Sequence, residues 1–136
     1  MKLKELLSIV KQTQNTYNTS EVFICGGVVR DKYMNRLDHV NDVDLTTGDK
    51  SIHILSEKLG DVLAEKYKIT QKNSDGHSSI RLGNVKLDFS SNYIVPNIDN
   101  ILMKLNINNV NDLSREMFSR DFTCNSLLLN LELNKI

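Results

Sequence analysis

The spacing of apolar residues predicts a helix at the start of the chain. Leu3, Leu6, Leu7 and Val10 recur at intervals of three and four residues, with charged residues between them. This is the period of an amphipathic helix with one buried face. A polar, turn-prone stretch at residues 15–20 follows, and we expect the helix to end there.

Two short runs rich in β-branched and aromatic residues predict strands at residues 22–25 and 40–47. The first run ends in a Gly-Gly pair, which indicates a tight turn, and residues 28–36 are then expected to form a helix. A further amphipathic helix is predicted over residues 51–67, with Ser51 as its N-terminal cap. Its apolar stripe consists of Ile52, Leu55, Leu59, Leu63 and Ala64.

Three strands are predicted in the middle of the chain, at residues 68–72, 77–82 and 85–90. Gly83 and Asn84 separate the last two, and this pair is typical of a tight hairpin because both residues tolerate positive φ. A short helix at 111–118 and a final strand at 127–131 complete the order. The order predicts a mixed α/β (α+β) fold in which helices pack on one face of a small, largely antiparallel sheet.

The length and the net charge of the chain limit which classes of function are possible. The 136 residues suffice for a single domain, and 17 basic residues balance 17 acidic ones, so the net charge is zero. A neutral molecule exerts no long-range attraction on a polyanion, so any phosphate-binding site must be local. No apolar run is long enough to span a membrane. Two distant cysteines without metal-type spacing favour a reducing, cytoplasmic setting.

Two carboxylates in the strand at 40–47 form a candidate metal site. Asp42 and Asp44 are two residues apart, so in a strand both point to one side while Val43 and Leu45 point to the other. Like charges this close repel unless they are solvated or neutralised by a cation. Mg²⁺ commonly binds one or two carboxylates together with substrate phosphates. The alternative is an exposed strand that carries two solvated aspartates.

The Gly26-Gly27 pair is a candidate phosphate-binding turn. A strand that ends in two glycines and leads into a helix lets backbone N–H groups approach a phosphate closely. Arg30, about one turn into the predicted helix, could reach a nucleotide. Asp31 either takes part in the same site or only complements the positive end of the helix.

Two further segments carry candidate site residues. In residues 85–90, Lys86, Asp88 and Ser90 alternate with apolar residues. If this strand neighbours the strand at 40–47, Asp88 completes a cluster of three carboxylates; otherwise it is a surface residue of a hairpin. Near the C-terminus, Arg120 and Asp121 precede a threonine and an asparagine and offer a phosphate or ribose ligand, although in isolation they read as a helix cap.

Taken together, four segments in order resemble a known family. These are GGVVRD at residues 26–31, DVDLTT at 42–47, the carboxylate-bearing strand at 85–90 and RDFTCNSL at 120–127. They resemble the head domain of class II tRNA nucleotidyltransferases and bacterial poly(A) polymerases, in the polymerase β-type nucleotidyltransferase superfamily. The resemblance covers roughly residues 21–130.

The resemblance implies a role for each matching residue. Asp42 and Asp44, joined by Asp88, would be catalytic and bind metal. The residues implied to bind nucleotide are Gly26, Gly27, Arg30, Asp31, Arg120, Asp121 and Asn125, of which Asn125 is rather structural. Ser119 stands where the family usually has a first arginine before the Arg-Asp pair, and Ser90, Ser91 and Asn92 stand where it often has an arginine after the third carboxylate.

The resemblance also implies a reaction. It is the Mg²⁺-dependent transfer of a nucleoside monophosphate from ATP, or alternatively CTP, to an RNA 3′ end, with tRNA as the first choice and pyrophosphate released. We expect residues 1–136 to form one head domain without the neck, body and tail domains. The alternatives are transfer to another acceptor, a nucleotide-binding module without turnover, and one half of a split enzyme that needs a second protein chain.

Overall fold

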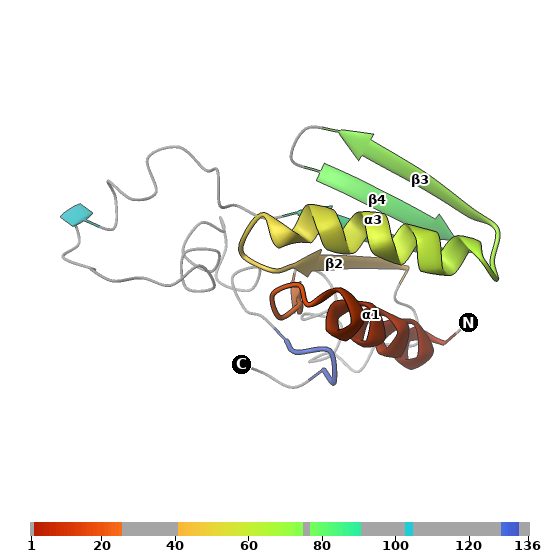
Figure 1. Cartoon of the computed structure of the whole chain (residues 1–136), viewed down its shortest axis with the longest axis horizontal. Coiled ribbons are helices and arrows are strands. Elements are labelled where there is room, and N and C mark those ends of the chain that lie inside the picture. Colours follow the sequence, from red (N-terminus) through yellow and green to blue (C-terminus); the bar gives the residue numbers. More distant parts are fainter. Residues whose placement is uncertain (1, 26–40, 75–76, 91–102, 105–128, 134–136) are drawn as a thin grey trace.

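The computed structural model describes residues 2–25, 41–74, 77–90, 103–104 and 129–133. Its elements form a mixed α/β fold, as the sequence predicts (Figure 1). The elements are α1 (Leu3–Tyr17), β1 (Phe23–Cys25), β2 (Asp42–Thr46), α3 (Ser51–Ala64), β3 (Ile69–Ser74), β4 (His77–Leu82) and β5 (Val85–Ser90).

The first helix, α1, follows the predicted pattern closely. Leu6, Leu7 and Val10 are buried, and the helix ends at Tyr17. The next residue, Asn18, adopts a left-handed backbone (φ 53°) and donates its N–H to the carbonyl of Gln14. Asparagine tolerates this conformation better than most residues, so the polar stretch ends the helix at little cost.

The five strands form one sheet in the order β1-β2-β5-β4-β3. The pair β2–β5 is parallel and the other three pairs are antiparallel, which confirms the largely antiparallel sheet. The predicted hairpin between β4 and β5 is confirmed, and its Gly83 has φ of 58°, a conformation that glycine adopts without steric penalty. Non-neighbouring parts of the sequence, β2 and β5, thus lie side by side at the centre of the sheet.

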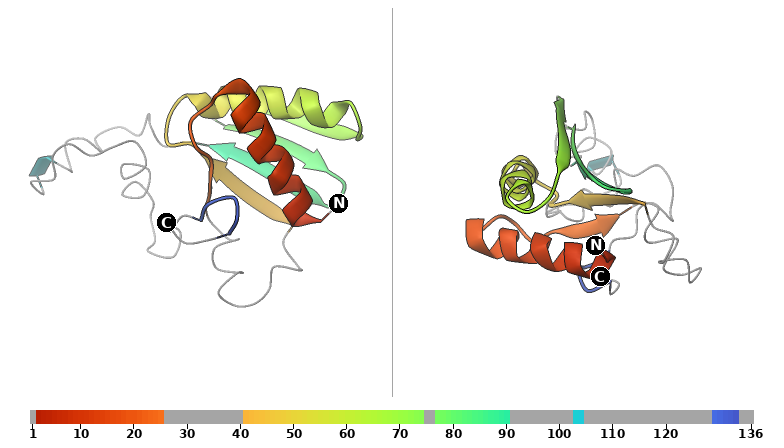
Figure 2. Two further views of the ribbon diagram at one scale, coloured as in Figure 1. Left: turned by 60° about the horizontal axis from the view of Figure 1, so that its bottom comes forward. Right: turned by 90° about the vertical axis from the view of Figure 1, so that its right-hand side faces the viewer.

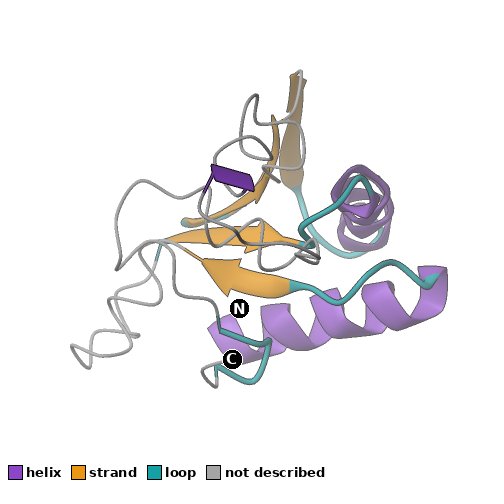
Figure 3. Ribbon diagram, turned by 90° about the vertical axis from the view of Figure 1, so that its left-hand side faces the viewer, coloured by secondary structure: helices purple, strands orange, loops and turns teal. Residues whose placement is uncertain are grey.

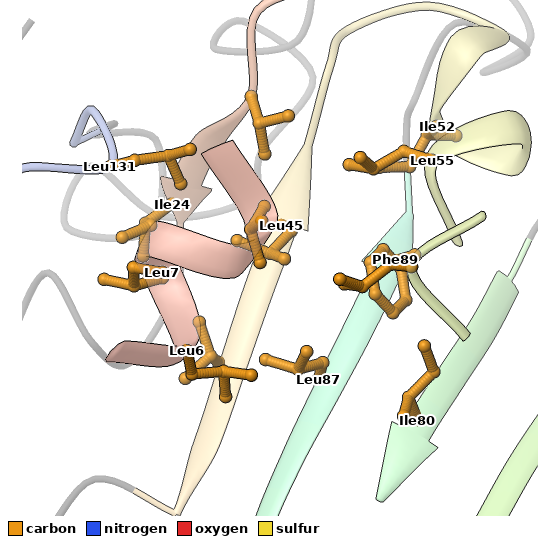
Figure 4. Packing of buried hydrophobic residues seen from close by; sticks show 14 of the residues in the cluster. Leu6, Leu7, Ile24, Leu45, Ile52, Leu55, Ile80, Leu87, Phe89 and Leu131 are labelled. Atoms are coloured by element: carbon orange, nitrogen blue, oxygen red, sulfur yellow. The ribbon is translucent and has the colours of Figure 1, made fainter. Parts of the chain in front are cut away.

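Both described helices lie on the same face of the sheet (Figures 2 and 3). The hydrophobic core fills the space between helices and strands. Figure 4 shows Leu6 and Leu7 of α1 near Ile24 and Leu45 of the sheet. The side chains with no exposed surface include Val43, Leu45, Leu55, Leu59, Ile80 and Leu87. The opposite face of the strands is therefore the one left for polar side chains.

Several predicted boundaries differ from the structure. Helix α3 ends at Ala64 rather than residue 67, although the N–H groups of Lys66 and Tyr67 still donate to the carbonyl of Leu63. Ala64 is exposed and does not belong to the buried stripe. The prediction that Ser51 caps this helix was wrong, because the side chain of Asp49 accepts the hydrogen bond at that end.

The C-terminal strand predicted at 127–131 is represented, in the described residues, by a single antiparallel bridge between Ile24 and Leu129. The helices predicted at 28–36 and 111–118 lie outside the described residues. Among the helices of the described part of the chain, none is both long and apolar enough to cross a membrane.

Candidate active site

The parallel pair of strands at the centre of the sheet brings two of the candidate carboxylates together. Asp44 of β2 and Asp88 of β5 are direct partners in the register, and Asp42 is opposite Lys86. This confirms that β2 and β5 are neighbours. The hypothesis that Asp88 joins Asp42 and Asp44 in one cluster depended on that position. Residues aligned across a parallel pair point to the same side, so Asp44 and Asp88 share one face.

That face is the one opposite the helices. Val43 and Leu87, which alternate with the aspartates, have no exposed surface. Asp42 is exposed, and Asp44 and Asp88 are half-buried. We call this side of strands β2, β5, β4 and β3 the polar face; by register it carries Asp42, Asp44, Lys86, Asp88, Ser79, Arg81, Thr70 and Lys72.

Lys86 forms an ion pair with one of these carboxylates. Its Nζ lies 3.3 Å from Oδ1 of Asp88, and both side chains are about one-third exposed (37% and 33%). The pair follows from the alternation of a strand, since residues two apart lie on the same side. Lys86 therefore offsets part of the repulsion between Asp88 and the neighbouring Asp44.

The three carboxylates do not converge into one ready-made metal site. Within the described residues, no group of three or more His, Cys, Asp or Glu side chains is arranged to hold a metal ion. The three-carboxylate cluster thus stays a prediction. The physical reason is plain: carboxylates repel each other, and the side chain of Asp88 contacts Lys86.

The donor set still fits Mg²⁺. Magnesium takes oxygen ligands, keeps several waters, and is usually held by one or two carboxylates plus substrate phosphates rather than by a complete protein cage. Asp44 and Asp88 supply such a pair on adjacent strands, with Asp42 two residues away. The face that carries them is exposed enough for waters and phosphates to complete the coordination.

Strand β1 connects this face to the predicted phosphate-binding turn. Its last residue, Cys25, is the register partner of Asp44, and its Sγ lies 3.6 Å from the backbone carbonyl oxygen of Asp44. Gly26 and Gly27 follow directly in the sequence. The predicted nucleotide-binding residues all lie outside the described residues: Gly26, Gly27, Arg30, Asp31, Arg120, Asp121 and Asn125.

The sequence matches the family model for the poly(A) polymerase head domain over residues 22–136. The match covers most of the chain and includes every candidate site residue. The chain belongs to the poly(A) polymerase head-domain family. The resemblance inferred from the four motifs is thereby confirmed, as is the expectation of a nucleotidyltransferase-type head. Among curated proteins, none matches the sequence significantly.

Solved structures share the fold of this poly(A) polymerase head domain. A tRNA-processing enzyme in an apo form has a TM-score of 0.68 and 22% identity, with 98% of this chain and 31% of that chain covered. A CCA-adding enzyme in complex with CTP has a TM-score of 0.67 and 20% identity, with 93% and 27% covered. A tRNA nucleotidyltransferase with a primer tRNA and an incoming ATP analogue has a TM-score of 0.60 and 24% identity, with 93% and 33% covered.

These comparisons establish the fold, and the head domain spans about a third or less of the length of each of these relatives. Sequence reasoning missed a set of hydrogen bonds that lies where β2 leads into α3.

Asp49 is the centre of that set. Its Oδ1 accepts hydrogen bonds from the N–H of Ser51 (2.9 Å) and from the hydroxyls of Ser51 (2.6 Å) and Thr47 (3.0 Å). Its Oδ2 accepts one from the hydroxyl of Ser20 (2.5 Å), on the loop before β1. One carboxylate thus ties together the end of β2, the start of α3 and the chain entering β1.

The pKa of Asp49 reflects this arrangement. Partial burial by itself raises the pKa of the carboxyl, but hydrogen bonds from Ser20, Ser51 and Thr47 favour the charged form and together lower the pKa below its ordinary value. A group with a depressed pKa in the folded state stabilises the fold above its ordinary pKa. That contribution is lost as the pH falls through the folded pKa.

We therefore expect Asp49→Asn to lower the free energy of unfolding by about 1 kcal/mol at pH 7, because the amide is a weaker acceptor for this cap. The difference from the wild type should shrink as the pH is lowered below about 3.8, the ordinary pKa of the group. Urea denaturation at pH 7 and pH 3 measures both values. Asp61→Asn, on an exposed position of α3, serves as control, and a difference that does not change with pH would contradict the role given to Asp49.

Proposed function

We propose that the chain transfers a nucleoside monophosphate from a ribonucleoside triphosphate to the 3′-hydroxyl of an RNA, with tRNA as the first acceptor to test, and releases pyrophosphate. The observation that carries this proposal is the register of β2 and β5, which aligns Asp44 with Asp88 on the polar face. Aligned carboxylates beside a predicted phosphate-binding turn suit phosphoryl transfer, in which positioning and charge neutralisation do most of the catalysis.

The solved relatives support the choice of substrates. They include CCA-adding enzymes in complex with CTP and with ATP, and a tRNA nucleotidyltransferase in complex with a primer tRNA and an ATP analogue. The incoming nucleotide in our proposal is ATP or CTP. The proposed setting is cytoplasmic, in line with two distant cysteines that show no metal-type spacing.

Each residue has a distinct part in the proposed mechanism. Asp42 and Asp44 would hold two Mg²⁺ ions, and Asp88 would help to bind the one that activates the acceptor hydroxyl. When bound, Mg²⁺ supplies positive charge that makes the hydroxyl more acidic and neutralises charge on the phosphates. Because Val43 and Leu87 are fully buried, both strands are anchored in the core, and their pairing sets the backbone positions of the carboxylates before the substrates bind.

The remaining proposed contacts come from the segments that flank the sheet. Backbone N–H groups at Gly26 and Gly27 would approach the triphosphate, which Arg30 and Arg120 would orient by charge-assisted hydrogen bonds. Asp121 would position the sugar. Asp31 would complement the positive end of its helix, and Asn125 would order the turn that carries Arg120.

A direct assay tests the proposal. The purified chain, Mg²⁺, a labelled triphosphate and tRNA that lacks its 3′ end are incubated, and the products are sequenced. We expect Mg²⁺-dependent extension that EDTA abolishes. CCA addition and oligo(A) addition are the two products consistent with the proposal. Nucleotide binding without extension of any RNA would contradict it.

A second candidate is a catalytic head that works with another protein chain. The head domain corresponds to 27–33% of the length of the relatives described above. In that case a second chain supplies the neck and body functions. Extension would then appear only after a second protein is added to the chain, whereas activity of the chain alone would contradict this candidate.

A further inference from the structure

Two cations face each other on the polar face. Arg81 of β4 and Lys86 of β5 are direct partners in the antiparallel register. Lys72 of β3 is a diagonal neighbour of Arg81, because Thr70 is the direct partner of Arg81. Like charges placed directly opposite each other in a sheet destabilise it. Anionic partners for the three cations would relieve this repulsion.

In the part of the chain that the structure describes, an acidic side chain compensates one of the three cations. Lys86 is paired with Asp88. Among the described residues, no carboxylate forms an ion pair with Arg81 or Lys72, and both of these side chains are exposed. The surface between them is therefore positively charged and accessible, and the described residues supply it with no counterion. An anion would turn an unfavourable arrangement into a favourable one.

The cations form a row that leads away from the carboxylates. The strand order β2-β5-β4-β3 places Arg81 one strand beyond Lys86 and Lys72 one strand further. Neighbouring strands lie about 4.8 Å apart, so the row extends about 10 Å from β5. This length suits an extended chain of phosphates better than one small ion.

The two sides of the carboxylates are chemically distinct. On one side, β1 ends at Cys25, opposite Asp44, and the predicted triphosphate-binding turn begins at the next residue. On the other side lie β5, β4 and the row of cations. In phosphoryl transfer the attacking and leaving oxygens are roughly in line. If pyrophosphate leaves toward β1, the attacking 3′-hydroxyl comes from the side of β4.

We propose that Arg81, Lys86 and Lys72 bind the phosphodiester backbone of the RNA acceptor immediately upstream of its 3′-hydroxyl. This inference rests on the proposed function and adds the surface that holds the acceptor strand. The planar guanidinium of Arg81 donates two parallel hydrogen bonds to one phosphate. Lys86 lies between the carboxylates and this phosphate and contributes charge to both.

The test compares Arg81→Met with the wild-type chain and with Lys4→Met, which removes the same charge from α1. We expect Arg81→Met to raise the Kd for a single-stranded RNA oligonucleotide about 5- to 10-fold and to reduce the slope of log K against log salt by about one. The Kd for the triphosphate should not change. Lys72→Met should act in the same direction with a smaller effect, and Arg81→Lys should restore part of the affinity.

A second readout separates RNA binding from a structural role. Without RNA, Arg81→Met relieves the repulsion with Lys86, so its Tm should equal or slightly exceed that of the wild type. Three results would overturn the inference: RNA affinity and salt slope equal to the wild type, a loss confined to triphosphate binding, or the same loss in Lys4→Met. Absence of RNA extension by the wild-type chain contradicts instead the proposed function, so the two failures are distinguishable.

Discussion

Replacing Asp44 by asparagine is expected to reduce nucleotide incorporation by about 10³-fold or more while the fold stays intact. The amide keeps the size of the side chain but removes the charge that would hold Mg²⁺ next to Asp88. Asp44 is the residue of choice because it is the register partner of Asp88. Initial rates of RNA extension at saturating triphosphate measure the loss, and thermal unfolding checks the fold.

Asp61→Asn is the matched control for this experiment, because Asp61 is an exposed residue of α3. Figure 2 shows that α3 packs on the other face of the sheet. The rate of Asp61→Asn should equal that of the wild type. An Asp44→Asn variant that extends RNA at the wild-type rate would refute the assignment of the β2–β5 pair as the catalytic centre.

The largest effect on stability is expected from Leu55→Ala in α3. Leu55 has no exposed surface and belongs to the core between helix and sheet, so its truncation should lower the free energy of unfolding by about 2–5 kcal/mol. For a domain whose total stability is about 5–15 kcal/mol, this is a large fraction. Chemical denaturation monitored by circular dichroism gives the value.

The neighbouring residue provides a control on the same helix. Ile54 is 50% exposed, so Ile54→Ala should change the stability by less than about 0.5 kcal/mol. Equal losses in the two variants would show that α3 does not pack as described. The comparison also tests whether α3 packs against the sheet whose other side is the polar face.

Most helices and strands of the described part could be predicted from the sequence, because their patterns involve residues that are close together in the chain. The alternation in residues 85–90 and the positive φ of Gly83 depend on a few neighbouring residues, and both appear as predicted. The end of α3 was predicted three residues too late. Its exposed last turn is stabilised by hydrogen bonds to Leu63, which periodicity does not reveal.

What the sequence could not supply is the register between distant strands. Spacing and the family resemblance were enough to predict that Asp42, Asp44 and Asp88 are site residues. They did not reveal whether β5 lies beside β2. Arg81 was not predicted as a site residue, because its proposed role depends on its position opposite Lys86. Only the strand register shows that position. Asp49 was missed for a related reason, since its contact with Ser20 joins segments far apart in the sequence.

The parallel pairing of β2 and β5 has a consequence for folding kinetics. Strands β3, β4 and β5 are consecutive in the sequence and pair antiparallel with one another. By contrast, α3 and two strands separate β2 from its partner β5 in the sequence. Closing such a long loop costs entropy that a local hairpin avoids, so this pairing should form late. A chain in which the β4–β5 hairpin forms before β2 joins it has Asp88 in place without Asp44, so the proposed catalytic pair is assembled only when β2 pairs with β5.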